Sequence, residues 1–156
     1  MAKAKTALEQ LHSDKQPHVV TPIPQGFPGW KDGDSMVVST PGEIDGIVRQ
    51  IPRGALVTLN EVRAHLARKH GTDIACPVST AIFLNVVARA AAELESLGET
   101  GAPYWRVLRP GGLLNEKYPG GTDAHRALLE SEGYTVVQVR KTWKVDGYER
   151  SLFTLD

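Results

Sequence analysis

The fold is decided by residues 57–98, VTLNEVRAHLARKHGTDIACPVSTAIFLNVVARAAAELESLG. Thr58 and Glu61 form a Thr-x-x-Glu capping box that predicts the start of a helix, and Gly71 suits its C-terminal end. Pro77 fits the first position of a second helix, whose alanines and leucines have high helix propensity. The second helix is apolar on most of its circumference, so we expect it to be largely buried. Two helices joined by a short turn predict a helix-turn-helix.

The flanking segments predict one helix before this pair and a mixture of strands and helix after it. Thr40, Pro41 and Glu43 give a second capping box at the start of a helix that stops at Pro52. Residues 104–118, YWRVLRPGGLLNEKY, read as a hairpin that turns around RPGG. Residues 121–133 form a further predicted helix, capped by Thr122 or Asp123. The alternation in VVQVRKTWKV, with a turn at DGY, predicts a terminal β-hairpin.

The resulting fold class is mainly α with small β. We expect a winged helix-turn-helix domain over residues 40–133, because two helices and a short turn are followed by a β-wing. Residues 134–156 would form a C-terminal β-hairpin packed on the same domain. Residues 1–39 are expected to be an extended, partly flexible N-terminal arm, since QPHVVTPIPQGFPGWKDGDS is rich in proline and glycine. Phe27 and Trp30 would pin this arm to the domain.

Composition narrows the classes of partner. The 156 residues carry 18 basic and 18 acidic side chains, so there is no overall attraction to nucleic acid or to an anionic membrane. A nucleic-acid role therefore needs a local basic face, with these candidate cations: Arg53, Arg63, Arg68, Lys69, Arg106, Arg109 and Lys117. A single cysteine, Cys76, excludes an internal disulfide and fits a cytoplasmic protein. The five histidines show no metal-ligand spacing, and no apolar run is long enough to predict a membrane span. We expect no metal, no cofactor and a monomer.

Four segments, taken in order, resemble a known family. IPRGALVT (51–58), CPVSTA (76–81), PYWRVLRPGGLLN (103–115) and LLESEG (128–133) are similar to the DNA-binding domain of the alkylguanine-DNA alkyltransferases. In that family a cysteine within a Pro-Cys-His-Arg motif removes an alkyl group from a guanine flipped out of the duplex. Here the tetrapeptide is Pro103-Tyr104-Trp105-Arg106, so the acceptor cysteine is replaced by Tyr104. A phenol with a pKa near 10 and no adjacent base is a poor nucleophile, so we expect no enzymatic activity.

The chain is more similar to the alkyltransferase-like proteins, which also lack the cysteine and bind alkylated DNA without repairing it. The resemblance implies a DNA partner, which is an alkylated duplex in that family, and other repair proteins that respond to the flagged lesion. The side chains expected to contact DNA or an exposed base are Thr58, Ser79, Thr80, Asn85, Tyr104, Trp105, Arg106 and Arg109. Tyr104 and Trp105 would either wall a base-sized pocket or lie in the core and seal it.

Two other functions are compatible with the sequence. The family's threonine-tyrosine pair appears as Thr58-Leu59, and its wedge arginine falls at Ala81, which is too short to fill a base stack. These departures, with the zero net charge, also suit a protein-interaction or small-ligand module that has lost DNA binding. A third reading is an active alkyltransferase that uses Cys76, since a helix N-terminus can lower the pKa of a thiol.

Overall fold

The structure is a computed structural model that describes residues 6–23 and 34–155. It is mainly α with small β, as the sequence predicts. The elements follow one another as α1 (Ala7–Leu11), β1 (His18–Val20), β2 (Met36–Val38), α2 (Pro41–Val48), β3 (Val57–Thr58), α3 (Leu59–His70), β4 (Ile74–Ala75), α4 (Pro77–Ser96), η1 (Tyr104–Arg106), β5 (Val107–Leu108), η2 (Pro110–Gly112), α5 (Gly121–Ser131), β6 (Val136–Val139), β7 (Thr142–Val145) and η3 (Tyr148–Ser151), where η marks a 3₁₀ helix.

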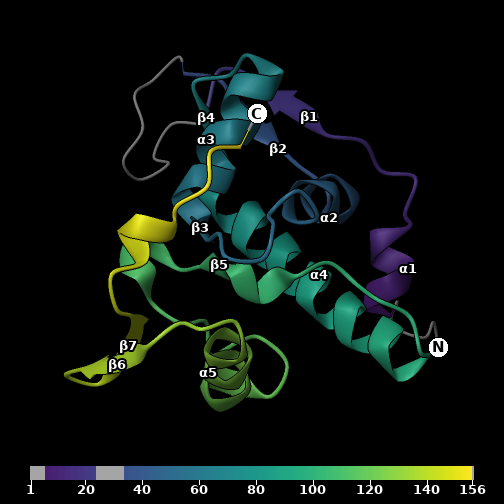
Figure 1. Ribbon diagram of the computed structural model, residues 1–156. Coiled ribbons are helices and arrows are strands. Elements are labelled where there is room, and N and C mark those ends of the chain that lie inside the picture. The colour runs from purple at the N-terminus through teal and green to yellow at the C-terminus, as the bar shows by residue number, and fades with distance from the viewer. Residues whose placement is uncertain (1–5, 24–33, 156) are drawn as a thin grey trace.

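Helix α4 is the central helix of the structure. Figure 1 shows it running diagonally through the structure, with α1 and α2 along one side, and both of these helices pack against it. Its inner face contributes Leu84 and Val87 to a core that also contains Ile44 and Val48 of α2 and Val62 of α3. By length and hydropathy α4 would pass for a membrane-spanning helix, so the prediction that no run is long enough is wrong. The packing of α1, α2 and η1 around it is that of a core helix.

Helices α3 and α4 form the predicted helix-turn-helix. Gly71 ends α3 in the left-handed region at φ 64°, a conformation that glycine adopts without a steric penalty. Cys76 caps α4 by accepting the N–H of Ser79 on its sulfur at 3.5 Å, and Pro77 occupies the first turn as predicted. Between the two helices the chain adds β4, which pairs in parallel with β2.

The two predicted capping boxes are only partly formed. Thr40 Oγ1 accepts the N–H of Glu43 at 3.2 Å, as expected, but the Glu43 carboxylate is held elsewhere, by Ser39, Lys69 and His70. Thr58 makes no hydrogen bond to the backbone of α3, and its hydroxyl donates to the carboxylate of Glu61 instead. Both carboxylates therefore bind side chains in place of the backbone N–H of the N-cap residue.

The N-terminal region is more than an arm over the residues that the structure describes. Glu93 of α4 accepts the N–H groups of Ala7 and Leu8 at 3.1 Å each, which satisfies two free donors at the start of α1. Strands β1 and β2 pair antiparallel and join β4 in a three-stranded sheet in the order β1-β2-β4. The proposed docking residues Phe27 and Trp30 lie outside the described residues.

The predicted hairpin at residues 104–118 is replaced by a different arrangement. Strand β5 pairs in parallel with β3, so it is joined to the start of α3 and not to the following LLN segment. At the expected turn, the chain passes through η2, and a single antiparallel bridge joins Arg109 and Leu113 on either side of it. Helix α5 begins after Gly120, at φ 81°, and neither Thr122 nor Asp123 caps it.

The C-terminal hairpin is present, with its turn at a different place. Strands β6 and β7 pair antiparallel, and the chain reverses at Arg140 and Lys141, where Arg140 has φ 58°. The DGY segment instead leads into η3. The hairpin and α5 enclose a second cluster of buried side chains, which includes Leu108, Leu129 and Val145.

Candidate functional site

A pocket of about 390 Å³ lies between α4 and the segment from β5 to the start of α5. Its walls are mostly apolar, and its polar groups come from α4 and from the loop after η2. The residues that line it are Leu59, Ala81, Leu84, Asn85, Leu108, Arg109, Pro110, Asn115, Glu116, Lys117 and Tyr118. This volume is within the usual range for a pocket that holds a small molecule or a base.

The floor of the pocket is built by a chain of hydrogen bonds. Tyr118 is buried, and its hydroxyl donates to the carbonyl of Val107 at 2.9 Å. The ring of His125, also buried, packs edge-on against Tyr118 with centroids 4.8 Å apart. His125 Nδ1 accepts the N–H of Asn115 at 3.0 Å, and Nε2 lies 2.9 Å from the carbonyl of Trp105. The loop that carries Asn115 is thus tied to both η1 and α5.

These contacts fix the protonation state of His125. Because the N–H of Asn115 needs an acceptor, Nδ1 is unprotonated and Nε2–H donates to Trp105. Burial lowers the pKa of His125 to about 4, against a smaller opposing effect of the carbonyl of Trp105. The ring is therefore neutral at pH 7 and acts as a connector inside the protein.

Two of the eight predicted contact residues line this pocket. Asn85 lies on α4, and Arg109 is exposed at the beginning of η2. Leu59 and Ala81 line it too, so the two positions that the sequence resemblance pairs with the family's tyrosine and arginine come together here. The side chains at these two positions are apolar and short enough to leave the pocket open.

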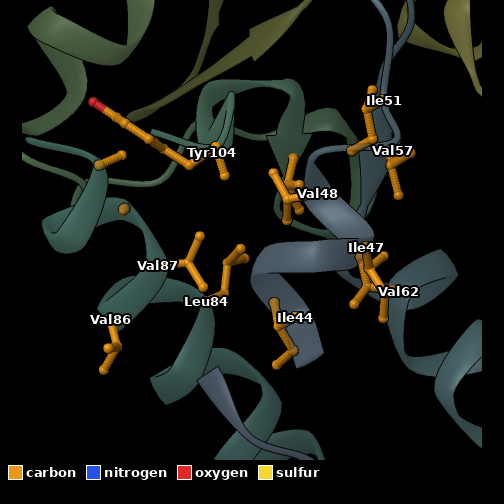
Figure 2. Close-up of a cluster of buried hydrophobic side chains, with 14 of the residues drawn as sticks. Ile44, Ile47, Val48, Ile51, Val57, Val62, Leu84, Val86, Val87 and Tyr104 are labelled. Atoms are coloured by element: carbon orange, nitrogen blue, oxygen red, sulfur yellow. The ribbon is translucent and has the colours of Figure 1, made fainter. Parts of the chain in front are cut away.

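Four of the predicted contact residues have structural roles. Thr80 is fully buried and donates to the carbonyl of Cys76 at 2.6 Å, and Thr58 is buried against Glu61. Tyr104 is part of the main core, where its ring packs edge-on against Tyr118 at 5.0 Å. Figure 2 shows it at the edge of the aliphatic cluster, with its hydroxyl directed away from the labelled side chains.

Arg106 is the fourth of these residues. It forms a two-pronged salt bridge with Glu132, at 3.0 Å from Nε and 2.7 Å from Nη2, and Nη1 donates to the carbonyl of Ile51 at 2.8 Å. Burial raises the pKa of Glu132, but the hydrogen bonds from Arg106 outweigh it and hold that pKa below its ordinary value. A guanidinium used in this way is not available to a phosphate.

The remaining two, Ser79 and Trp105, are half-buried. The Ser79 hydroxyl is sealed from solvent beside the N-terminus of α4. Trp105 packs between the two buried clusters, with the guanidinium of Arg106 at 5.5 Å from its ring centroid. Neither side chain lines the pocket.

Most of the candidate cations are already bound within the protein. Arg53, Arg63 and Arg68 donate to the carbonyls of Ser131, Ala75 and Leu155, respectively. Lys69 pairs with Glu43 at 2.9 Å. Arg109 and Lys117 are both exposed on the pocket rim, with Glu116 beside them, so the basic character of this face comes from these two side chains.

A larger hollow of about 910 Å³ lies between α2, α3 and residues 154–155. Its charged side chains have partners: Lys69 pairs with Glu43, and Arg68 donates to the carbonyl of Leu155. Burial raises the pKa of Glu43, but the hydrogen bonds from Ser39, Lys69 and His70 together outweigh it. The pKa of Glu43 is therefore below its ordinary value. Among residues 6–23 and 34–155, no three His, Cys, Asp or Glu side chains are grouped so that they could hold a metal ion.

Sequence reasoning missed the amide of Asn115. It lies in the segment LLN, which the hairpin prediction treated as a strand. Its Oδ1 accepts the N–H of Lys117 at 2.9 Å, an asparagine turn that the sequence NEK was sufficient to suggest. No local sequence pattern marks Tyr118 as a pocket residue, because its position depends on packing against α5.

The comparisons with known proteins agree with this architecture. No protein-family model matches the sequence, and no curated protein matches it. Among solved structures, the S. pombe alkyltransferase-like protein in complex with DNA aligns at a TM-score of 0.50 and 20% identity, over 73% of this chain and 94% of that chain. The S. pombe protein in complex with damaged DNA containing O6-carboxymethylguanine gives a TM-score of 0.50 and 22% identity, with the same coverage.

The chain has the fold of an alkyltransferase-like protein. This confirms at the level of fold the resemblance that the sequence motifs suggested. The structure differs from the sequence prediction at residues 104–118. The predicted β-wing hairpin is absent there, and β5 pairs with β3 instead.

Proposed function

We propose that this protein binds DNA without altering it chemically, and that the pocket between α4 and the loop at residues 109–117 receives an exposed base. The observation that carries the proposal is the meeting of Leu59, Ala81, Arg109 and Lys117 at one pocket. The first two are the positions that the resemblance assigns to DNA contact. The other two are exposed cations suited to phosphates. The S. pombe complexes with DNA support this choice of ligand.

The proposal assigns the contacts differently from the sequence motif. Arg106 and Tyr104 are part of the core, so the phosphate contacts fall to Arg109 and Lys117 and the base contacts to the pocket walls. Ala81 cannot fill the space left by a flipped base, so binding would favour lesions whose base is already unpaired or weakly stacked. Recognition of alkylated bases is the form of this function that the resemblance favours.

A binding titration of the full chain tests the proposal. Fluorescence anisotropy would compare an undamaged duplex, an alkylated duplex and a duplex with an unpaired base at two salt concentrations. We expect affinity to fall with salt and to be highest for the damaged or unpaired sites. Arg109→Ala and Lys117→Ala should each reduce the salt slope by about one. Lys141→Ala, at the turn between β6 and β7 and outside the pocket lining, is the matched control. Absence of binding to all three duplexes at low salt, or equal effects of the three variants, rules the proposal out.

No alkyl transfer is part of the proposed function. Burial raises the pKa of Tyr104, with a smaller contribution from Glu95, so the phenol is even less nucleophilic than in water. Cys76 is buried and caps α4 away from the pocket lining. After incubation with a labelled alkylated duplex, the intact mass of the protein should be unchanged. A mass increase by one alkyl group would instead support the alkyltransferase reading.

A protein-binding role is the second candidate, and the outer face of α4 favours it. Val78 and Ile82, one turn apart, are 60% and 53% exposed, and no cation lies between them along the helix. Such a face suits an apolar partner better than a phosphate backbone. Val78→Ser with Ile82→Ser separates the two functions: the pair should leave duplex binding within about twofold if the pocket and its rim carry the affinity.

A further inference from the structure

The pocket contains a pair of side-chain amides joined to each other. Asn115 Nδ2 donates to Asn85 Oδ1 at 3.1 Å, which links α4 to the loop after η2. Asn85 lies four residues after Ala81 and therefore on the same face of α4, directly above the position of the family's wedge residue. Both amides line the pocket.

The orientation of this amide pair is determined by the backbone around it. Asn115 Oδ1 accepts the N–H of Lys117 at 2.9 Å, so its Nδ2 is the group that faces Asn85. The backbone N–H of Asn115 is in turn fixed by Nδ1 of His125 at 3.0 Å. Because Asn85 Oδ1 is used as the acceptor, the group that Asn85 offers to the pocket is its Nδ2, a double donor.

This donor has no competing partner in the part of the chain that the structure describes. Over residues 6–23 and 34–155, no acceptor is hydrogen-bonded to Asn85 Nδ2, and this nitrogen is not sealed from solvent. The adjacent walls are the apolar side chains of Leu59, Leu84 and Leu108. A pocket in which apolar side chains surround an amide donor suits a flat ring that carries acceptors on one edge.

We propose that Asn85 is a specificity-determining residue: its Nδ2 donates to an acceptor on the edge of an exposed nucleobase, and Asn115 holds the amide in the orientation that makes this possible. The inference rests on the proposed function, since it names what the pocket reads. It predicts a preference for bases that present ring nitrogens or carbonyl oxygens to the pocket, as guanine does with N7 and O6. Arg109 and Lys117 contribute affinity that does not depend on the base.

The test uses the full chain and two duplexes that differ at one nucleotide. One has a guanine opposite an abasic site, and the other has a nonpolar purine mimic of the same shape at that position. The abasic partner removes the cost of unpairing, which matters because Ala81 provides no wedge. We expect the wild type to bind the guanine duplex about tenfold more tightly than the mimic duplex.

Three variants distinguish recognition of the base by Asn85 from affinity that does not depend on the base. Asn85→Leu should bring the ratio of the two affinities close to one, because it removes the amide donor. Asn85→Asp keeps the shape, removes the donor and should also abolish the ratio, so the test survives if the leucine variant is unstable. Lys117→Ala should weaken both duplexes equally and preserve the ratio.

The outcomes separate the two proposals. Binding of both duplexes with a ratio near one in the wild type, or a ratio retained in both Asn85 variants, overturns the inference about Asn85 and leaves DNA binding in place. Absence of binding to both duplexes at low salt overturns the proposed function, and the inference with it.

Discussion

The short helix η1 and the loop at residues 109–117 are neighbours in sequence, but their polar side chains differ in exposure and in partners. Arg106 in η1 is 14% exposed and tied to Glu132, while Arg109, three residues later, is exposed at the pocket rim. Tyr104 packs into the main core, while Asn115 lines the pocket. The motif that the sequence singled out as a site is thus a support for the site that follows it. The comparison teaches that a motif resembling a reaction centre in sequence can be occupied by core packing and an internal salt bridge.

The salt bridge gives the largest difference between the two regions. Arg106→Ala would leave the carboxylate of Glu132, which is 5% exposed, without its partner and would also free the carbonyl of Ile51. We expect a loss of about 3 kcal/mol in the free energy of unfolding, measured by urea denaturation. Arg109→Ala, the matched control, should change it by less than about 0.5 kcal/mol. Similar losses in the two variants would remove the distinction between support and site.

The buried histidine that links the regions should make stability depend on pH. The folded pKa of His125, about 4, is below its unfolded value near 6.5, so the unfolded chain binds the extra proton first. Its contribution is complete above pH 6.5 and is lost as the pH falls to about 4, with a total of about 3 kcal/mol. Urea unfolding of the wild type and of His125→Gln across this range would show the difference. Parallel pH profiles would mean that His125 is already protonated, or exposed, in the folded protein.

The smallest effect concerns two tyrosines that touch each other. Tyr118→Phe removes a buried hydrogen bond to the carbonyl of Val107 and should cost about 1 kcal/mol. Tyr104→Phe removes a hydroxyl that points away from the core and should be nearly neutral for stability. Thermal unfolding of both variants sharpens the comparison, since the sequence motif singles out Tyr104 and the structure gives the polar role to Tyr118. A larger loss from Tyr104→Phe than from Tyr118→Phe would reverse this assignment.

The parts of the fold that were predictable are those with local causes. Thr40, Pro41, Gly71 and Pro77 mark helix ends through their own backbone preferences, and each is found at the predicted end. The alternation of residues 136–145 predicted the last hairpin, although its turn lies at Arg140 and not at DGY. A turn can shift by several residues without changing which faces alternate.

The parts that were not predictable depend on contacts between distant segments. The pairing of β5 with β3 joins residues that lie about fifty positions apart, and the capping of α1 by Glu93 spans 86 positions. The eight residues predicted to contact DNA were chosen for their chemistry, and only Asn85 and Arg109 line the pocket. A side chain's chemical type does not reveal whether a partner elsewhere in the chain already uses it.

By itself, the sequence determined the helix-turn-helix and the resemblance in fold to the alkyltransferase-like proteins. The tertiary structure alone decided that Arg106 is used internally, that Arg109 and Lys117 remain exposed, and that the amides of Asn85 and Asn115 meet in one pocket. The physical reason is that helix ends and turns are governed by nearest neighbours along the chain. The availability of a charge or a hydrogen-bonding group is governed by whatever the folded chain brings within about 3 Å of it.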